Sequence, residues 1–216
     1  MGVAYCQQSI EHLHSPRTER QLHLLRLVLA VLLALGLQSA WVLLGLLLLG
    51  IVMLQLYVGP YNGGSDRMSL LMLCCLCLTH WLPTEQGREL ALGYLALQLT
   101  LSYFMAGAVK IINPAWRNGQ ALADVFSFSA YPVSESLRQW SNAPRLLLLM
   151  SWLVMLLELL FPLSFLHHTV LYIALALTAA FHLANALLFG LNRFFWVWLA
   201  AYPSLLWLQQ RLMIGH

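Results

Sequence analysis

The sequence predicts an all-α membrane protein, a multi-pass bundle of transmembrane helices. Of its 216 residues, 61% are hydrophobic and only 9% are charged, whereas soluble domains carry about 25% charged residues. The mean hydropathy is +0.75, and no polar stretch is long enough to enclose a soluble core. The net charge of +3 comes mostly from arginines at the ends of apolar runs. Such charges inform on topology, so we expect a lipid bilayer as the surroundings and no nucleic-acid partner.

About seven spans are expected, because a bilayer needs about 20 apolar residues per helix. Residues 1–20 are polar and form the expected cytoplasmic tail, and residues 21–216 form the expected transmembrane domain. No small-residue cleavage site follows the first apolar run, so that run is predicted to be a permanent anchor. The expected spans cover residues 21–37, 40–58, 68–82, 90–111, 144–166, 168–189 and 194–210.

Turn-forming residues separate these runs. Residues 36–39 hold Gly36 and mark a break between the first two spans, and residues 59–67 form a glycine-rich loop. Within the fifth span, Pro162 removes the backbone donor for the Glu158 carbonyl, so the helix is expected to kink there.

Residues 112–143 form the longest segment without a span, between the fourth and fifth spans. The segment mixes short apolar pieces with tryptophan and arginine, including Trp116 and Arg138. This composition predicts an interfacial or re-entrant segment.

The arginines predict an orientation in the cell (inner) membrane. With seven spans and a cytoplasmic N-terminus, most arginines lie on the inner side, and only Arg88 and Arg211 lie outside. Cytoplasmic loops carry an excess of Lys and Arg, so this asymmetry favours a cytoplasmic N-terminus.

Lys110 is the only lysine of the sequence, and it ends a long apolar run. On a helix, Tyr103, Gly107 and Lys110 share one face. Two interpretations are open: a lysine that snorkels to the interface at the end of a span, or a buried amine placed for chemistry. Every other cation is an arginine, and lysine is the cation that can supply a neutral amine as a base.

Three further polar positions lie in or beside apolar runs. Glu158 is the only acid well inside one, and it is either a packing group or a functional carboxyl. His182 and Asn185 lie three positions apart on one helix, either as an interhelical hydrogen-bonding pair or as part of a site. Arg193 either anchors a turn or faces an anionic ligand group. No second histidine follows His182 at four positions, so no metal is expected.

These positions predict a pocket between helices in which a few polar groups converge. Such a pocket is typical of a site for a lipophilic cofactor. The sequence contains no Gly-rich phosphate loop and no nucleophile elbow.

Two stretches carry a resemblance to a known family. Residues 103–119 read YFMAGAVKIINPAWRNG, and residues 181–203 read FHLANALLFGLNRFFWVWLAAYP. Their pattern of Y-F-x-A-G-x-x-K, W-x-x-G and then F-H-L-x-N resembles the horizontally transferred transmembrane (HTTM) family. That family includes the membrane domain of vitamin K-dependent gamma-carboxylases. Where the carboxylases have an Asn-Asn-His stretch, this chain has Asn-Gly-Gly-Ser at residues 62–65.

The resemblance implies a catalytic site and a cofactor. Lys110 matches the lysine taken as the base that deprotonates vitamin K hydroquinone, and His182 matches a histidine near the same site. The expected activity is therefore lyase chemistry of the carboxylase and epoxidase type, with a reduced quinone as cofactor and a peptide or lipid as substrate. Taken together with the pocket, the expected cofactor-binding residues are Tyr103, Gly107, Trp116, Glu158, Asn185 and Arg193.

A non-enzymatic role is the alternative. The chain would then be a membrane scaffold, or a quinone-binding accessory subunit that works with a partner protein in peptide maturation. A small transporter is disfavoured, because the sequence shows no internal repeat.

Overall fold

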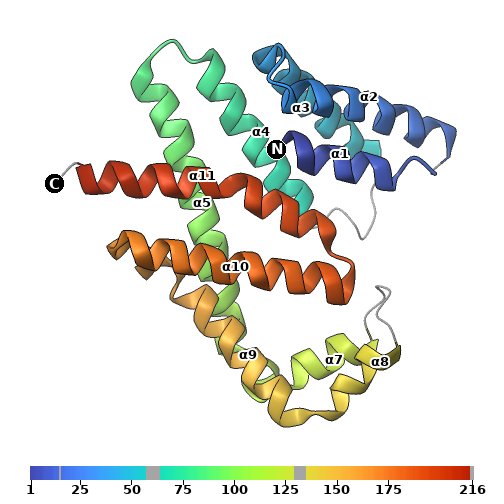
Figure 1. Ribbon diagram of the computed structural model, residues 1–216, viewed down its shortest axis with the longest axis vertical. Coiled ribbons are helices and arrows are strands. Elements are labelled where there is room, and N and C mark those ends of the chain that lie inside the picture. The colour runs from blue at the N-terminus through green and yellow to red at the C-terminus, as the bar shows by residue number, and fades with distance from the viewer. Residues whose placement is uncertain (15, 57–63, 129–134, 215–216) are drawn as a thin grey trace. The chain divides into compact units, whose positions relative to one another are not determined.

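The computed structural model describes residues 1–14, 16–56, 64–128 and 135–214, and every regular element in these ranges is a helix (Figure 1). Three of the described helices are long and apolar enough to cross a membrane: α3 (Ser39–Leu56), α5 (Glu85–Ile112) and α10 (His168–Phe189). A bent pair, Glu135–Asn142 followed by Pro144–Leu159, could supply a fourth span. The prediction of an all-α protein with transmembrane helices is confirmed, and the count of seven spans stays a prediction.

The first of two compact units comprises residues 1–96 and 196–208. It contains α1 (Gly2–Glu11), α2 (Arg17–Ala34), α3 and α4 (Gly64–Trp81). Tyr5 of α1 belongs to a core with Ala30, Leu46 and Leu73 from the other three helices. A Cβ added to Gly2 would lie 2.8 Å from the Ala30 carbonyl oxygen. The polar N-terminal segment therefore contains a helix that packs closely against α2.

The break expected at residues 36–39 is present. Gly36 has a φ of 72° and Gln38 a φ of 49°, a backbone conformation that ends a regular helix. Of the expected loop at residues 59–67, residues 59–63 lie outside the described part. The remainder of that prediction is wrong, because α4 already begins at Gly64. Asp66 lies in the first turn of α4, where a carboxylate interacts favourably with the helix dipole.

The second compact unit comprises residues 97–195 and 209–216, so α5 and α11 (Asn192–Ile214) contribute to both units. Its remaining elements are α6 (Pro114–Arg117), α7 (Gln120–Phe128), α8 (Glu135–Arg138), η1 (Gln139–Asn142), α9 (Pro144–Leu159), η2 (Phe161–Leu166) and α10.

Between α5 and α9 the chain forms short helices rather than a span. In Figure 1, α7 lies beside the first part of α9, and α8 lies beside α7. Leu122 and Phe126 of α7 pack with Leu147 of α9 and Phe189 of α10. The Glu135–Asn142 segment meets Pro144–Leu159 at 94°. This geometry suits the interfacial or re-entrant segment predicted between the fourth and fifth spans, although residues 129–134 lie outside the described part.

Where Pro162 predicted a kink at Glu158, the α9 helix ends. It stops at Leu159, and the chain continues as the 3-10 helix η2. Gln209 of α11 is almost fully buried and donates to the carbonyls of Ser164 and Phe165, at 3.3 and 3.4 Å. A side chain from α11 thus supplies donors to backbone acceptors of the irregular segment, which a membrane interior requires.

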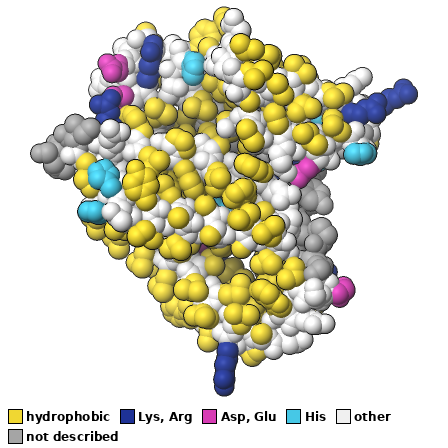
Figure 2. All heavy atoms as spheres, viewed as in Figure 1, with side chains coloured by type: hydrophobic (Ala, Val, Ile, Leu, Met, Phe, Trp, Pro, Cys, Tyr) yellow, Lys and Arg dark blue, Asp and Glu magenta, His cyan; other side chains and the backbone are white. Residues whose placement is uncertain are grey.

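The outer surface of the helices is mainly apolar. Figure 2 shows a face covered largely by hydrophobic side chains, with few charged groups. Large hydrophobic residues on the long helices are exposed, among them Ile112 at 75% and Leu187 at 74%. Extensive exposed apolar surface is rare on soluble monomers, so the helices are those of a protein in a lipid bilayer.

Candidate functional site

Lys110 forms an ion pair with Glu158 inside the second unit. The Lys110 Nζ donates to Oε1 and Oε2 of Glu158 at 2.7 and 2.5 Å. The Lys110 side chain is 19% exposed and that of Glu158 only 5%. Lysine contacts with both oxygens of a carboxylate are strong, charge-assisted hydrogen bonds. Lys110 is therefore a largely buried partner of an acid, not a lysine extended towards water.

Gly107 makes this pairing sterically possible. It lies one turn before Lys110, on the same face of α5. A Cβ at this position would lie 2.5 Å from the Leu159 backbone nitrogen and 3.0 Å from the Glu158 carbonyl carbon. Only glycine admits such a close approach of two backbones. The end of α9 thus reaches α5 where Glu158 can meet Lys110.

Trp116 covers the other side of the Lys110 ammonium. Its ring centroid lies 5.2 Å from the Lys110 Nζ, within the range of a cation–π interaction. The turn that carries Trp116 is fixed locally, because the Asn113 side chain accepts from the Ala115 amide at 2.9 Å and Pro114 occupies the first helical position of α6. Asn113 and Pro114 form a typical helix start.

Two α9 residues donate hydrogen bonds to backbone carbonyls of the same turn. The buried Ser151 hydroxyl donates to the Trp116 carbonyl at 2.5 Å, and the Trp152 indole donates to the Arg117 carbonyl at 3.1 Å. Gly119 follows with a φ of +81°, and a Cβ there would lie 3.0 Å from the Leu148 nitrogen. We did not predict a role for Ser151 or Trp152, because both lie in an apolar run with no motif. The one signal that could have pointed to them is that both side chains can donate a hydrogen bond.

Tyr103 and His182 form a second pair. The Tyr103 hydroxyl and the His182 Nε2 lie 2.9 Å apart, and both residues are buried. The Tyr103 ring also packs on Phe161 at 4.4 Å between centroids. This hydrogen bond joins α5 to α10, on the same face of α5 that carries Gly107 and Lys110.

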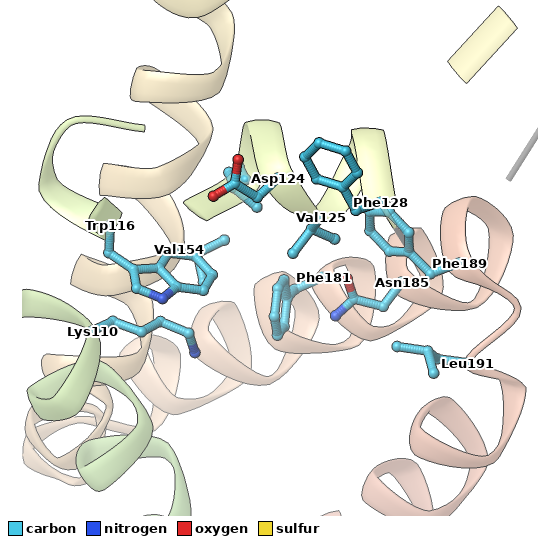
Figure 3. A pocket seen from close by; sticks show the side chains of 11 residues that line it. Lys110, Trp116, Asp124, Val125, Phe128, Val154, Phe181, Asn185, Phe189 and Leu191 are labelled. Atoms are coloured by element: carbon cyan, nitrogen blue, oxygen red, sulfur yellow. The ribbon is translucent and has the colours of Figure 1, made fainter. Parts of the chain in front are cut away.

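An apolar cavity of about 520 Å³ lies beside Lys110 in the second unit. Figure 3 shows Lys110 and Trp116 at one end of it and Phe189 and Leu191 at the other, with the Asn185 amide and the Phe181 ring between them. Aromatic and aliphatic side chains dominate its wall, which is formed by Lys110, Trp116, Leu122, Asp124, Val125, Phe128, Val154, Phe181, Asn185, Phe189 and Leu191. The volume is within the usual range for small-molecule sites, about 300–1,000 Å³.

The predicted site residues fall into three groups. Lys110, Trp116 and Asn185 line the cavity. Glu158 and Gly107 lie behind Lys110, and the Tyr103–His182 pair lies on neighbouring helices without lining the cavity. Arg193 is the second residue of α11 and is not part of the cavity wall. The described residues thus bring Lys110 and Asn185 to one cavity and Glu158 to Lys110, whereas His182 meets Tyr103 instead. The catalytic and binding roles of all these residues stay predictions.

Comparison with known families identifies the second half of the chain. The family model described as the HTTM domain matches residues 86–209, which is more than half of the sequence. The chain belongs to the HTTM family. No curated protein and no solved structure matches it.

The HTTM match contains the whole candidate site. Both stretches that resemble the family, residues 103–119 and 181–203, fall within residues 86–209. All residues of the cavity wall lie there as well. The helices α1 to α4 precede the match, so the site belongs to the HTTM domain.

Proposed function

We propose that the cavity binds a reduced quinone, a lipophilic aromatic molecule with an acidic hydroxyl, and that the Lys110–Glu158 pair removes a proton from it. The observation that carries this proposal is a buried ion pair whose lysine lines an apolar cavity of about 520 Å³. Burying two charges is costly, and replacing such a pair by apolar residues is often neutral or stabilising. An ion pair at a cavity wall is therefore better explained by chemistry than by stability.

The chain's own residues fit such a ligand. Phe181, Phe189 and Trp116 offer ring surfaces, and aromatic pairs stack favourably beyond their burial of area. Among the described residues, no side-chain hydrogen bond engages the Asn185 amide, which lines the cavity. It would hold a ligand oxygen, and Lys110 would contact the reacting hydroxyl. General-base catalysis of this kind contributes roughly 10²–10⁴ in rate.

The resemblance to vitamin K-dependent gamma-carboxylases extends this proposal. When bound, the reduced quinone would supply oxygen-dependent chemistry of the carboxylase and epoxidase type, directed at a peptide or lipid substrate. In this proposal the chain is a lyase of the inner cell membrane, with seven spans and a cytoplasmic N-terminus. The alternative is an accessory subunit that holds a quinone, in which the Lys110–Glu158 pair serves only to pack α5 against α9.

The test is the quinone content of the purified protein. The protein is purified in detergent, extracted with organic solvent and analysed for quinones per mole of protein. We expect a quinone in the wild type and its loss in Lys110→Met and Asn185→Leu. The first variant removes a charged group from the cavity wall, and the second removes an amide. Arg88→Met is the matched control, because Arg88 lies on the same α5 helix, bonds to the Leu82 carbonyl at 2.8 Å and is not part of the cavity wall.

Two outcomes would contradict quinone binding in this cavity. A quinone present in all four proteins would show binding elsewhere and would exclude this cavity. No quinone in any of them, and no binding of an added naphthol, would exclude the proposed ligand class.

A further inference from the structure

Resting on the proposed function, we propose that the proton taken from the ligand ends on Glu158, and that Lys110 passes it on and remains an ammonium. The observation is the arrangement of three groups in series: cavity, Lys110 and Glu158. Lys110 lines the cavity, and its Nζ bonds to both oxygens of Glu158. Glu158 does not line the cavity, and its side chain is 5% exposed.

The surroundings of Lys110 favour the ammonium form. A carboxylate faces its Nζ on one side, at 2.5 and 2.7 Å. The face of the Trp116 ring lies on another, at 5.2 Å, and a ring face attracts a cation. An ammonium has three N–H bonds and no lone pair. Lys110 can therefore accept a proton only if it gives one of its own to Glu158.

Access decides the route. A hydroxyl in the cavity can reach Lys110, because that side chain forms part of the wall. Glu158 does not line the cavity and bonds to the Lys110 Nζ, so a proton that arrives from the cavity passes through the Lys110 Nζ. Glu158 is then the acceptor, and Lys110 is the group that touches the ligand.

The transfer is balanced in atoms and charge. The ligand O–H bond breaks and a new N–H bond forms on Lys110, while one N–H bond directed at Glu158 breaks and an O–H bond forms on Glu158. The carboxylate becomes a carboxylic acid, and the negative charge moves to the ligand oxygen, next to the unchanged ammonium. One ion pair replaces another, so no additional charge is created in a poorly solvated site.

The other titratable groups around this route have different partners. Tyr103 of α5 and His182 of α10 bond to each other at 2.9 Å. Asp124 of α7 is exposed and accepts from the Gln120 amide at 2.7 Å. The exposed Glu135, whose side chain is 91% exposed and pairs with Arg138 at 3.4 Å, provides a matched control acid.

The experiment uses 1-naphthol as the probe. It is neutral in water between about pH 6 and pH 8, like other simple phenols, and its anion absorbs at longer wavelength than its neutral form. The full-length protein in lipid nanodiscs is titrated with the probe between about pH 6 and pH 8 in weak buffer. Absorbance gives the ionised fraction of the bound probe, and a pH indicator gives the protons released. The proteins are the wild type, Glu158→Gln and the control Glu135→Gln.

If Glu158 keeps the proton, the wild type and Glu135→Gln bind the probe as its anion without releasing protons, and the ionised fraction does not change with pH. In Glu158→Gln the proton must leave for water. The ratio of bound anion to neutral probe then rises about tenfold per pH unit, with release approaching about one proton per probe.

Two results would overturn the inference while leaving the proposed function intact. These are proton release from the wild type on binding, or equal pH dependence in the wild type and Glu158→Gln. A probe that binds and stays neutral would overturn the inference and would also contradict the proton removal in the proposed function. The wild-type measurement decides the matter alone if Glu158→Gln does not fold. A probe that fails to bind the wild type above empty nanodiscs contradicts the proposed function instead.

Discussion

Two buried cations, one in each unit, have very different surroundings. Arg26 on α2 is 7% exposed, and its Nε donates to the Ser9 hydroxyl at 3.0 Å. Its Nη2 lies 3.0 Å from the His23 Nδ1, and its guanidinium lies 5.5 Å from the centre of the Tyr5 ring. Burial raises the pKa of the Tyr5 phenol well above its usual value, so Tyr5 stays neutral beside Arg26. Since Ser9 and Tyr5 belong to α1, Arg26 fastens α1 to α2.

Lys110 differs in the partner and in the space next to it. Its partner is a carboxylate that can take a proton, and its other side borders an apolar cavity. Arginine is always charged and offers a rigid fork of donors, which suits a fixed structural contact, whereas lysine can exchange its proton. A buried cation alone therefore does not identify a functional site. Our proposal rests instead on the combination of a lysine, a proton-accepting partner and an adjoining cavity.

Removing one member of the Lys110–Glu158 pair is expected to have the largest effect. Lys110→Met leaves the Glu158 carboxylate buried without its cation, which should lower the free energy of unfolding by about 3–5 kcal/mol. The double variant Lys110→Met/Glu158→Met removes both charges and should recover most of that loss. Unfolding in mixed detergent micelles, followed by circular dichroism, measures both changes.

This pair of variants also tests the contrast with Arg26. The stable double variant should lack quinone, whereas Arg26→Met should be destabilised and still retain quinone, since Arg26 is not part of the cavity wall. A double variant as unstable as Lys110→Met would mean that the pair is kept for packing. Lys110 would then resemble Arg26, and the distinction between the two cations would fail.

A smaller effect is expected at the glycine that brings α9 to Lys110. Gly107→Ala places a Cβ 2.5 Å from the Leu159 nitrogen, and overpacking of this kind costs about 1–3 kcal/mol. The ion pair should weaken and quinone content should fall. Gly93→Ala is the control in the same helix, because a Cβ there meets only Trp207 at 3.8 Å. It should be neutral or stabilising by up to about 1 kcal/mol, since alanine favours helix over glycine. Equal unfolding midpoints for the two variants would show that α5 and α9 do not need this close approach.

Local signals in the sequence predicted much of the helical arrangement. The expected span at residues 168–189 coincides with α10 (His168–Phe189), because His167 supplies the N-cap and Gly190, with a φ of 68°, the C-cap. Pro162 likewise indicated an interruption at Glu158, where α9 ends at Leu159. The start of α4 was missed, since a glycine-rich stretch looks like a loop until Asp66 is placed in a first helical turn.

Contacts between distant residues were beyond such reasoning. Lys110 and Glu158 are 48 positions apart, so their pairing depends on how α5 meets α9. The sequence indicated that both residues are unusual in apolar runs, but it did not predict that they contact each other. His182 was expected at the cofactor site, but it bonds to Tyr103, which lies 79 positions away in the sequence. Both residues were predicted to belong to the site, but no local pattern indicated that they contact each other.

The smallest expected effect concerns the cover over Lys110. Ser151→Ala removes the hydroxyl that donates to the Trp116 carbonyl at 2.5 Å, a loss of about 1 kcal/mol for one hydrogen bond. Ser204→Ala is the matched control, because this buried hydroxyl bonds only within its own helix, to the Ala201 carbonyl at 2.7 Å. Both variants should lose similar stability, but only Ser151→Ala should weaken naphthol binding, by about fivefold. If the two variants bind the naphthol equally well, Trp116 does not need its anchor on α9. The Lys110 ammonium would then be stabilised by Glu158 alone. The contact with the Trp116 ring would no longer count among the differences between Lys110 and Arg26.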